Sequence, residues 1–123
     1  MGEWTVEYDD AFDAEVRAHS QAMQVKLAAV AKVLEEFGPL LGRPLVDTLK
    51  GSKHANMKEL RFKVAREAWR VAFAFDPKRK GILLAGGNQQ GVGKGSFYAE
   101  LIRIADERFD RHLARLKPRR RGA

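Results

Sequence analysis

The sequence predicts a small α+β fold: a mainly antiparallel sheet with two N-terminal helices packed on one face and a C-terminal helix. Apolar residues recur at helical spacing near both ends of the 123-residue chain, and three short strand-like runs follow one another between them. The connections between these runs are short enough for antiparallel hairpins. We therefore expect the order β-α-α-β-β-β-α in a single domain over residues 1–116, followed by a basic tail over 117–123.

The N-terminal third is expected to hold one strand and two helices. Residues 4–8 alternate apolar and polar side chains, as a short strand does. Asp9 follows and suits a helix N-cap, where its carboxylate can accept bonds from free backbone N–H groups. A helical pattern runs over residues 11–37, and Ser20 in its middle can cap a second helix, giving a helical hairpin or a bend. Gly38-Pro39 ends the pattern.

The middle of the chain is expected to form the sheet. Residues 38–57 hold three glycines, two prolines and little periodicity, so they predict a long connection. The three strand-like runs follow at Lys58–Val64, Trp69–Phe75 and Ile82–Ala85. Residues 97–117 then carry apolar side chains at helical spacing, and Ser96 is expected to cap this last helix.

Charge and composition limit the possible partners. Residues 1–49 hold 4 Lys/Arg and 9 Asp/Glu, residues 50–80 hold 10 and 3, and residues 81–123 hold 9 and 4, within a net charge of +7. This concentration of basic residues favours a polyanionic partner, with a solubilising surface as the alternative. The chain has no cysteine, which excludes disulfides and thiolate chemistry. Without a signal-peptide pattern or an apolar run of ~20 residues, we expect a cytoplasmic protein with no membrane partner.

The two longest predicted strands carry basic side chains on one face. Successive side chains of a strand point to opposite faces, so Glu59, Arg61 and Lys63 share one face, and Arg70 lies on the matching face of the next strand. Ala72 and Ala74 beside Arg70 are expected to leave space on an open face. Such a face could bind phosphate, because Arg forks match phosphate oxygens in pairs. A solvated sheet face is the alternative.

The glycine-rich stretch 86–95 lies between the last strand and the last helix. A nucleotide-binding P-loop needs the pattern GxxxxGK[ST], but the chain has Asn88 and Gly95 at two of the required positions. We therefore expect a flexible loop that carries Lys94 toward the open face, or a plain linker. The three histidines are far apart without metal-ligand spacing, so no metal site is expected.

Several stretches, in this order, resemble the RelE/HigB toxin superfamily, specifically its phage-derived HigB-like branch. They are residues 34–39 (LEEFGP), 42–52 (GRPLVDTLKGS), 57–62 (MKELRF) and 69–75 (WRVAFAF), extended by Phe97-Tyr98, Leu101-Ile102 and Ala105-Asp106. The resemblance covers residues 4–116. It implies a RelE-like fold and the toxin of a bacterial type II toxin–antitoxin system. Such toxins cleave messenger RNA, usually in the ribosomal A site, and are blocked by a cognate antitoxin.

The resemblance also implies catalytic residues. The motif positions correspond to Lys58, Arg61 and Arg70, and more loosely to Lys94, because the family usually has a compact basic segment where this chain has glycines. Preorganised Arg and Lys can orient the RNA 2′-OH and stabilise the phosphorane without metal or cofactor. Lys53, Lys63 and Arg66 are expected to contact RNA.

The proton-transfer group is left open between two side chains. Tyr98 is a candidate catalytic hydroxyl, with a packed aromatic at a helix start as the alternative. His54 is a candidate general base, with a solvent-exposed histidine as the alternative. Glu59 is interpreted only as an ion-pair partner of Arg61 or of a neighbouring basic residue.

The expected partners are mRNA and the ribosome, together with a cognate antitoxin that is a helix-turn-helix or an acidic protein. Operator DNA is expected only through that antitoxin. One alternative is a non-catalytic module of the same fold that binds RNA or a protein, and another is a homologue that targets a different enzyme complex. The toxin needs Arg61 and Arg70 on one open face, whereas a binder needs only diffuse charge.

Overall fold

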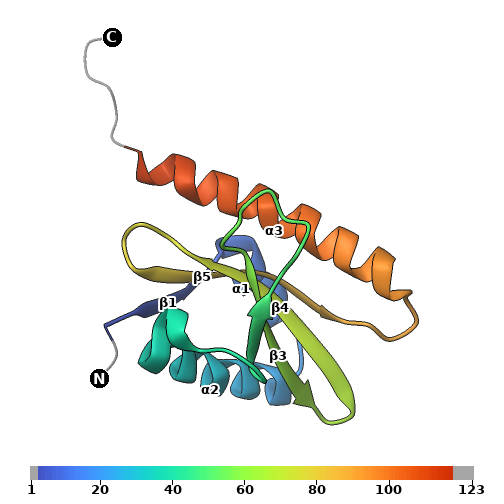
Figure 1. Ribbon diagram of the computed structural model, residues 1–123. Coiled ribbons are helices and arrows are strands. Elements are labelled where there is room, and N and C mark those ends of the chain that lie inside the picture. The colour runs from blue at the N-terminus through green and yellow to red at the C-terminus, as the bar shows by residue number, and fades with distance from the viewer. Residues whose placement is uncertain (1–2, 118–123) are drawn as a thin grey trace.

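The computed structural model describes residues 3–117 and confirms the α+β class (Figure 1). The strands are β1 Thr5–Tyr8, β2 Val46–Thr48, β3 Lys58–Val64, β4 Glu67–Phe75 and β5 Lys80–Asn88. The helices are α1 Asp10–Arg17, α2 Gln21–Phe37 and α3 Lys94–Leu116, with a short 3-10 helix at Gly38–Leu40. The predicted order holds, with β2 added inside the expected long connection. The predicted basic tail lies, after Lys117, outside the described residues.

The strands form one sheet in the order β1-β5-β4-β3-β2. The pairs β2–β3, β3–β4 and β4–β5 are antiparallel, whereas β1 runs parallel to the start of β5, from Thr5↔Lys80 to Tyr8↔Leu83. Within residues 3–117, the rest of β5 has a paired strand only on its β4 side. On the other side, Arg108 of α3 donates from Nη1 to the Leu84 carbonyl oxygen at 2.8 Å, and its guanidinium also pairs with Glu15 of α1.

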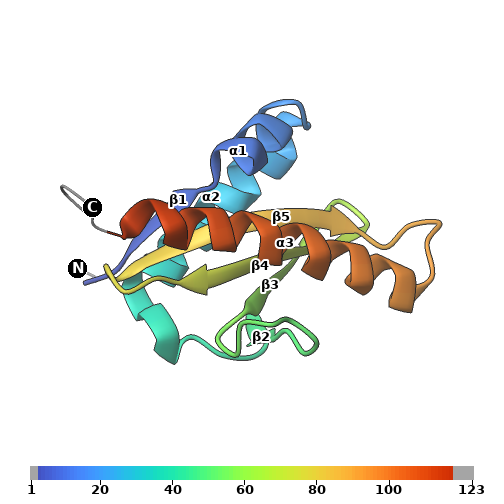
Figure 2. The same ribbon diagram turned by 90° about the horizontal axis from the view of Figure 1, so that it is seen from above.

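Helices cover both faces of the sheet, and the two N-terminal helices share one face as predicted. α1 and α2 pack on one face through Phe12, Val16, Met23, Leu27, Val30 and Leu34. The strands contribute Leu60, Phe62, Val64, Trp69, Val71 and Phe73 to this core. α3 covers the other face through Phe97, Leu101, Ala105 and Phe109. Figure 1 shows α3 above the sheet and α2 below it, and Figure 2 shows α3 lying over β5 and β4. None of the helices described between residues 3 and 117 has the length and apolar character needed to cross a bilayer.

The prediction of an open face around Ala72 and Ala74 is wrong. Both alanines are fully buried in the second core, beneath α3. Their small side chains let the helix pack close to β4, so the space that the sequence suggested is occupied by α3. The accessible part of this face lies toward the β3–β4 hairpin, where Lys63 is exposed and Arg61 and Arg70 are partly exposed.

The predicted helix starts are confirmed for α1 and α2 and wrong for α3. The side chains of Asp9 and Ser20 accept bonds from backbone N–H groups in the first turns of α1 and α2. α3 begins at Lys94, and its N-cap is Gly93, which makes no side-chain bond. Ser96 therefore lies inside the first turn instead of capping it, because a backbone bond to the Gly93 carbonyl already closes that turn.

β5 is longer than the predicted Ile82–Ala85. It continues to Asn88, so Gly86 and Gly87 belong to the strand, and the loop before α3 is limited to residues 89–93. A Cβ atom on Gly86 would lie 3.0 Å from Val71 Cγ2, and one on Gly87 would lie 3.2 Å from a ring carbon of Phe97. The two glycines thus let side chains of both cores approach the strand closely.

Candidate functional site

A basic pocket opens on the α3 side of the sheet, toward the β3–β4 hairpin. Arg61 and Arg70 are direct cross-strand partners on β3 and β4, so their side chains leave the sheet side by side. The pocket has a volume of about 370 Å³ and is lined by Arg43, Pro44, Arg61, Phe62, Lys63, Ala68 and Arg70. Four of these residues are cationic and none is acidic, so the pocket suits an anion such as a phosphate.

The two central arginines differ in burial. The side chain of Arg61 is 36% exposed, and that of Arg70 is 16% exposed. Arg61 Nη1 lies 3.7 Å from Asp47 Oδ2, and the same carboxylate accepts a bond from Arg43 Nη2 at 2.8 Å. The bond from Arg43 is the largest cause that lowers the pKa of Asp47. The ionised Asp47 therefore holds Arg43 and Arg61 together at one rim of the pocket.

A polar cluster adjoins the pocket at Arg70; we call it the Tyr98–Glu59–Arg70 cluster. The Tyr98 hydroxyl, from the start of α3, donates to Glu59 Oε1 at 2.8 Å. Arg70 Nε lies 3.8 Å from the same oxygen, and Arg70 Nη1 donates to the Trp69 carbonyl oxygen at 2.9 Å. The Glu59 side chain is only 8% exposed. A carboxylate of β3, a guanidinium of β4 and a phenol of α3 therefore meet at one point.

The surroundings of Tyr98 keep its hydroxyl protonated at neutral pH. Burial is the main cause that raises the pKa of Tyr98, and the hydrogen bond to Glu59 raises it further, while Arg70 opposes both. Arg70 Nε is buried and has no hydrogen-bond partner among the described residues. The cluster thus combines a proton donor, a carboxylate acceptor and a cation with one unused donor.

Three other predicted residues surround the same end of the molecule. Lys63 lines the basic pocket, and Arg66 is exposed in the turn between β3 and β4. Lys94, also exposed, begins α3 four residues before Tyr98, so the two side chains lie on the same side of the helix, one turn apart.

Lys58 lies on the opposite face of the sheet. It shares that face with Leu60, which is buried against the N-terminal helices, and its Nζ atom donates to the Pro39 carbonyl oxygen at 3.4 Å. The alternation of β3 therefore separates Lys58 from Arg61.

Lys53 and His54 lie against a different part of α3. His54 Nε2 is 2.8 Å from Asp110 Oδ1, and Lys53 forms an ion pair with the same carboxylate. Asp110 follows Tyr98 by twelve residues, or about 18 Å along the helix. The structure therefore does not bring Lys53 or His54 to the basic pocket. Nor do His, Asp and Glu side chains within residues 3–117 gather in threes as potential metal ligands.

Sequence reasoning missed two residues of this site. Arg43 lies in the irregular segment before β2, where no periodicity indicates a direction for its side chain. Strand alternation predicts Glu59 on the same face as Arg61, but the only role predicted for it is an ion pair with Arg61 or a neighbouring basic residue. Its bond to Tyr98 joins residues 39 positions apart and could not be inferred from local pattern.

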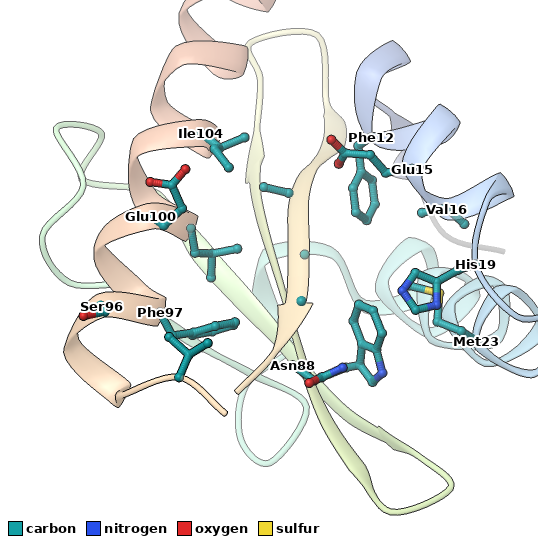
Figure 3. A pocket seen from close by; sticks show the side chains of 16 residues that line it. Phe12, Glu15, Val16, His19, Met23, Asn88, Ser96, Phe97, Glu100 and Ile104 are labelled. Carbon is teal, nitrogen blue, oxygen red and sulfur yellow. The ribbon is translucent and has the colours of Figure 1, made fainter. Parts of the chain in front are cut away.

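A larger cavity, of about 490 Å³, lies beside the second half of β5 (Figure 3). Phe12 and Val16 of α1 lie on one side of β5 and Phe97 of α3 on the other, so the lining is mostly apolar. It contains two acidic residues, Glu15 and Glu100, and no Lys or Arg. This cavity therefore does not suit a phosphate, in contrast to the basic pocket.

One family model matches this chain, and two similar proteins carry toxin names. A family model described as "Phage derived protein Gp49-like" matches residues 14–110. "Putative toxin HigB2" of Mycobacterium tuberculosis is 53% identical over 97 residues, which cover 76% of this chain and 48% of that protein. "Putative toxin HigB3" of the same organism is 49% identical over 82 residues, which cover 67% of this chain and 69% of that protein. The chain thus spans about half the length of HigB2. No solved structure matches the chain. These matches confirm the resemblance to the HigB-like branch.

Proposed function

The chain belongs to the phage-derived Gp49-like family, and on that premise we propose that it is the toxin of a toxin–antitoxin pair and cleaves messenger RNA. The observation that carries the proposal is the basic pocket with its adjoining cluster. The side chains of Arg61 and Arg70 leave adjacent strands side by side. The Tyr98 hydroxyl and Arg70 Nε both lie next to the same carboxylate oxygen of Glu59. Two guanidinium groups and a phenol on rigid elements can hold one phosphodiester and move a proton beside it.

The proposed reaction is an internal transesterification. RNA supplies its own nucleophile, the 2′-OH next to the scissile phosphate. The O2′–P bond forms and the P–O5′ bond breaks, which leaves a 2′,3′-cyclic phosphate and a 5′-OH end. Negative charge grows on the phosphorane oxygens, where Arg61 and Arg70 stabilise it. Because the substrate brings the nucleophile and the guanidinium groups bring the charge, this reaction requires neither metal nor cofactor.

Geometry distinguishes the two candidates for proton transfer. Tyr98 belongs to the same cluster as Arg70, whereas His54 contacts Asp110, twelve residues farther along α3. We therefore assign proton transfer to Tyr98 and leave His54 to its contact with the helix. Lys94, one turn before Tyr98, supplies a further cation for the phosphate or its neighbours.

The remaining basic residues serve to bind RNA in this proposal. Arg43 and Lys63 line the pocket, and Arg66 continues the positive surface to the tip of the hairpin. Such contacts to flanking phosphates position the strand without reading its sequence. A ribosome would present mRNA to this surface as an extended single strand, in the cytoplasm.

A toxin that cleaves mRNA requires an inhibitor in its own cell, so a cognate antitoxin is the proposed protein partner. An acidic segment of that antitoxin would complement the basic pocket and exclude RNA from it. A helix-turn-helix antitoxin would also connect the pair to operator DNA, which the toxin itself would not contact.

Induced expression without an antitoxin tests the proposal. We expect growth arrest and new 5′ ends within translated messages, mapped by primer extension. The Arg61→Ala variant, produced at the same level, is expected to give neither. Normal growth with intact messages at high levels of the wild-type protein would overturn the proposal and favour a non-catalytic RNA- or protein-binding module.

A further inference from the structure

Glu59 has surroundings that an ordinary ion pair does not explain. Its carboxylate is almost fully buried, yet its closest guanidinium atom, Arg70 Nε, stands 3.8 Å away, beyond hydrogen-bonding distance. The short contact, 2.8 Å, is with the Tyr98 hydroxyl. Burying a carboxylate costs free energy that a well-formed pair with Arg70 would offset better than this arrangement does. The main contact of the Glu59 carboxylate is therefore its hydrogen bond from Tyr98, not its ion pair with Arg70.

We infer that Glu59 is a positioning residue that acts through Tyr98, orienting its hydroxyl and taking up its proton during RNA cleavage. This inference rests on the proposed function. It adds a two-step proton path that starts at the substrate and ends on a carboxylate that the substrate does not touch.

The proton path balances as follows. As O2′ attacks phosphorus, the 2′ proton passes to the Tyr98 oxygen, and the hydroxyl proton of Tyr98 passes to Glu59 Oε1. The P–O5′ bond breaks, and the leaving 5′ oxygen takes a proton from solvent. Glu59 later releases its proton to solvent, so Tyr98 and Glu59 return to their starting states. Tyr98 carries no net charge at either end of the transfer.

The state of Tyr98 supports this path over direct abstraction of the 2′ proton by a tyrosinate. Burial and the bond to Glu59 raise the pKa of Tyr98, so the phenol is protonated at neutral pH and needs an acceptor before it can take a second proton. Arg70 supports the same arrangement from the other side. Its Nε is a buried donor without a partner among the described residues, so Glu59 makes its short contact with Tyr98 and leaves this donor unpaired.

Single-turnover cleavage of a ribosome-bound message by the Glu59→Gln variant tests the inference. The glutamine keeps the size of the side chain and an oxygen that accepts from Tyr98, but it cannot take up a proton in this pH range. We expect the saturated rate to fall about 100-fold or more. We also expect a rise of the rate with pH on the acid side in the wild type and none in the variant. The matched control is Glu67→Gln on β4, whose carboxylate accepts from Trp69 instead, and it should cleave at the wild-type rate.

A second comparison distinguishes a relay from two independent roles. Tyr98→Phe should lose about as much rate as Glu59→Gln, and the double variant should lose no more than either single variant, because both belong to one path. Multiplied losses in the double variant would overturn the relay. A wild-type rate and pH profile for Glu59→Gln would also overturn it, while an inactive Arg61→Ala variant would keep the proposed function intact. An inactive wild type would overturn the proposed function, and the inference with it.

A readout that does not depend on cleavage is the titration of Tyr98. In a Tyr8→Phe background, Tyr98 is the remaining tyrosine, and its phenolate can be followed by ultraviolet absorbance. Adding Glu59→Gln should lower the pKa of Tyr98, because it removes a charge that raises that pKa, whereas adding Glu67→Gln should leave it unchanged. Thermal unfolding verifies that each variant is folded. An unchanged Tyr98 pKa in Glu59→Gln would overturn the coupling on which the relay depends.

Discussion

Replacing Arg61 by alanine tests whether the basic pocket stabilises the transition state of cleavage or only binds RNA by electrostatic attraction. The Arg61 side chain is 36% exposed, and its ion pair with Asp47 spans 3.7 Å at the rim of the pocket. Exposed pairs of this kind contribute ~0–1 kcal/mol, so the free energy of unfolding should change by less than about 1 kcal/mol. Loss of a donor to the transition state, in contrast, costs ~3–4 kcal/mol, or a fall in rate of about 100–1000-fold.

The assay is single-turnover cleavage of ribosome-bound mRNA at saturating protein, with binding measured separately. Arg66→Ala is the matched control, because it removes the same charge from the exposed turn of the hairpin. Arg66→Ala, like truncation after Leu116, should weaken binding and its salt dependence but leave the saturated rate nearly unchanged. If Arg61→Ala cleaves at the wild-type rate while a control loses the chemical step, the basic pocket is not the site of cleavage.

Three further predictions concern metal, acid and packing. Cleavage should persist in a chelator; a loss that one divalent ion restores, with ribosome integrity verified, would contradict the proposed chemistry. Burial raises the pKa of Asp76, but hydrogen bonds from His112 and two backbone N–H groups outweigh burial, so the pKa is lowered in the folded state. The stability that Asp76 contributes is therefore present above its pKa in the unfolded chain and is lost as the pH falls through its pKa in the folded protein. Asp76→Asn should therefore lower the free energy of unfolding by about 1–3 kcal/mol at neutral pH and by less in acid, measured in denaturant; an equal loss at both pH values would argue against this reasoning. Gly86→Ala should destabilise by about 1–3 kcal/mol because its Cβ would lie 3.0 Å from Val71, whereas the matched change Gly42→Ala, in open space, should leave the thermal midpoint nearly unchanged.

Alternation along β3 and β4 was sufficient to predict one half of the candidate site. It predicts Arg61, Lys63 and Arg70 on one face, because a strand fixes the direction of each side chain locally. The same alternation puts Lys58 on the opposite face, a consequence that the prediction did not draw when it grouped Lys58 with Arg61 on the family resemblance. Where strand geometry and motif position disagreed, the geometry described the structure correctly.

The other half depends on how α3 docks, which no local pattern determines. The periodicity of residues 97–117 predicted an amphipathic helix but not the sheet face that it would cover. The helix therefore buries Ala72 and Ala74, and the same docking brings Tyr98 to Glu59. β2 could not be predicted for another reason, because a strand of three residues is too short to show alternation.

The parallel pairing of β1 with β5 has a consequence for how the chain folds during synthesis. Hairpins β3–β4 and β4–β5 join neighbours in sequence, but Thr5 finds its partner only at Lys80. Contacts between such distant residues form late, because a long loop must close first. β1 therefore leaves the ribosome before its partner β5 and can pair with it only after β5 has been made. Since Tyr98 comes later still, a nascent chain holds both arginines of the basic pocket before it holds the phenol beside them.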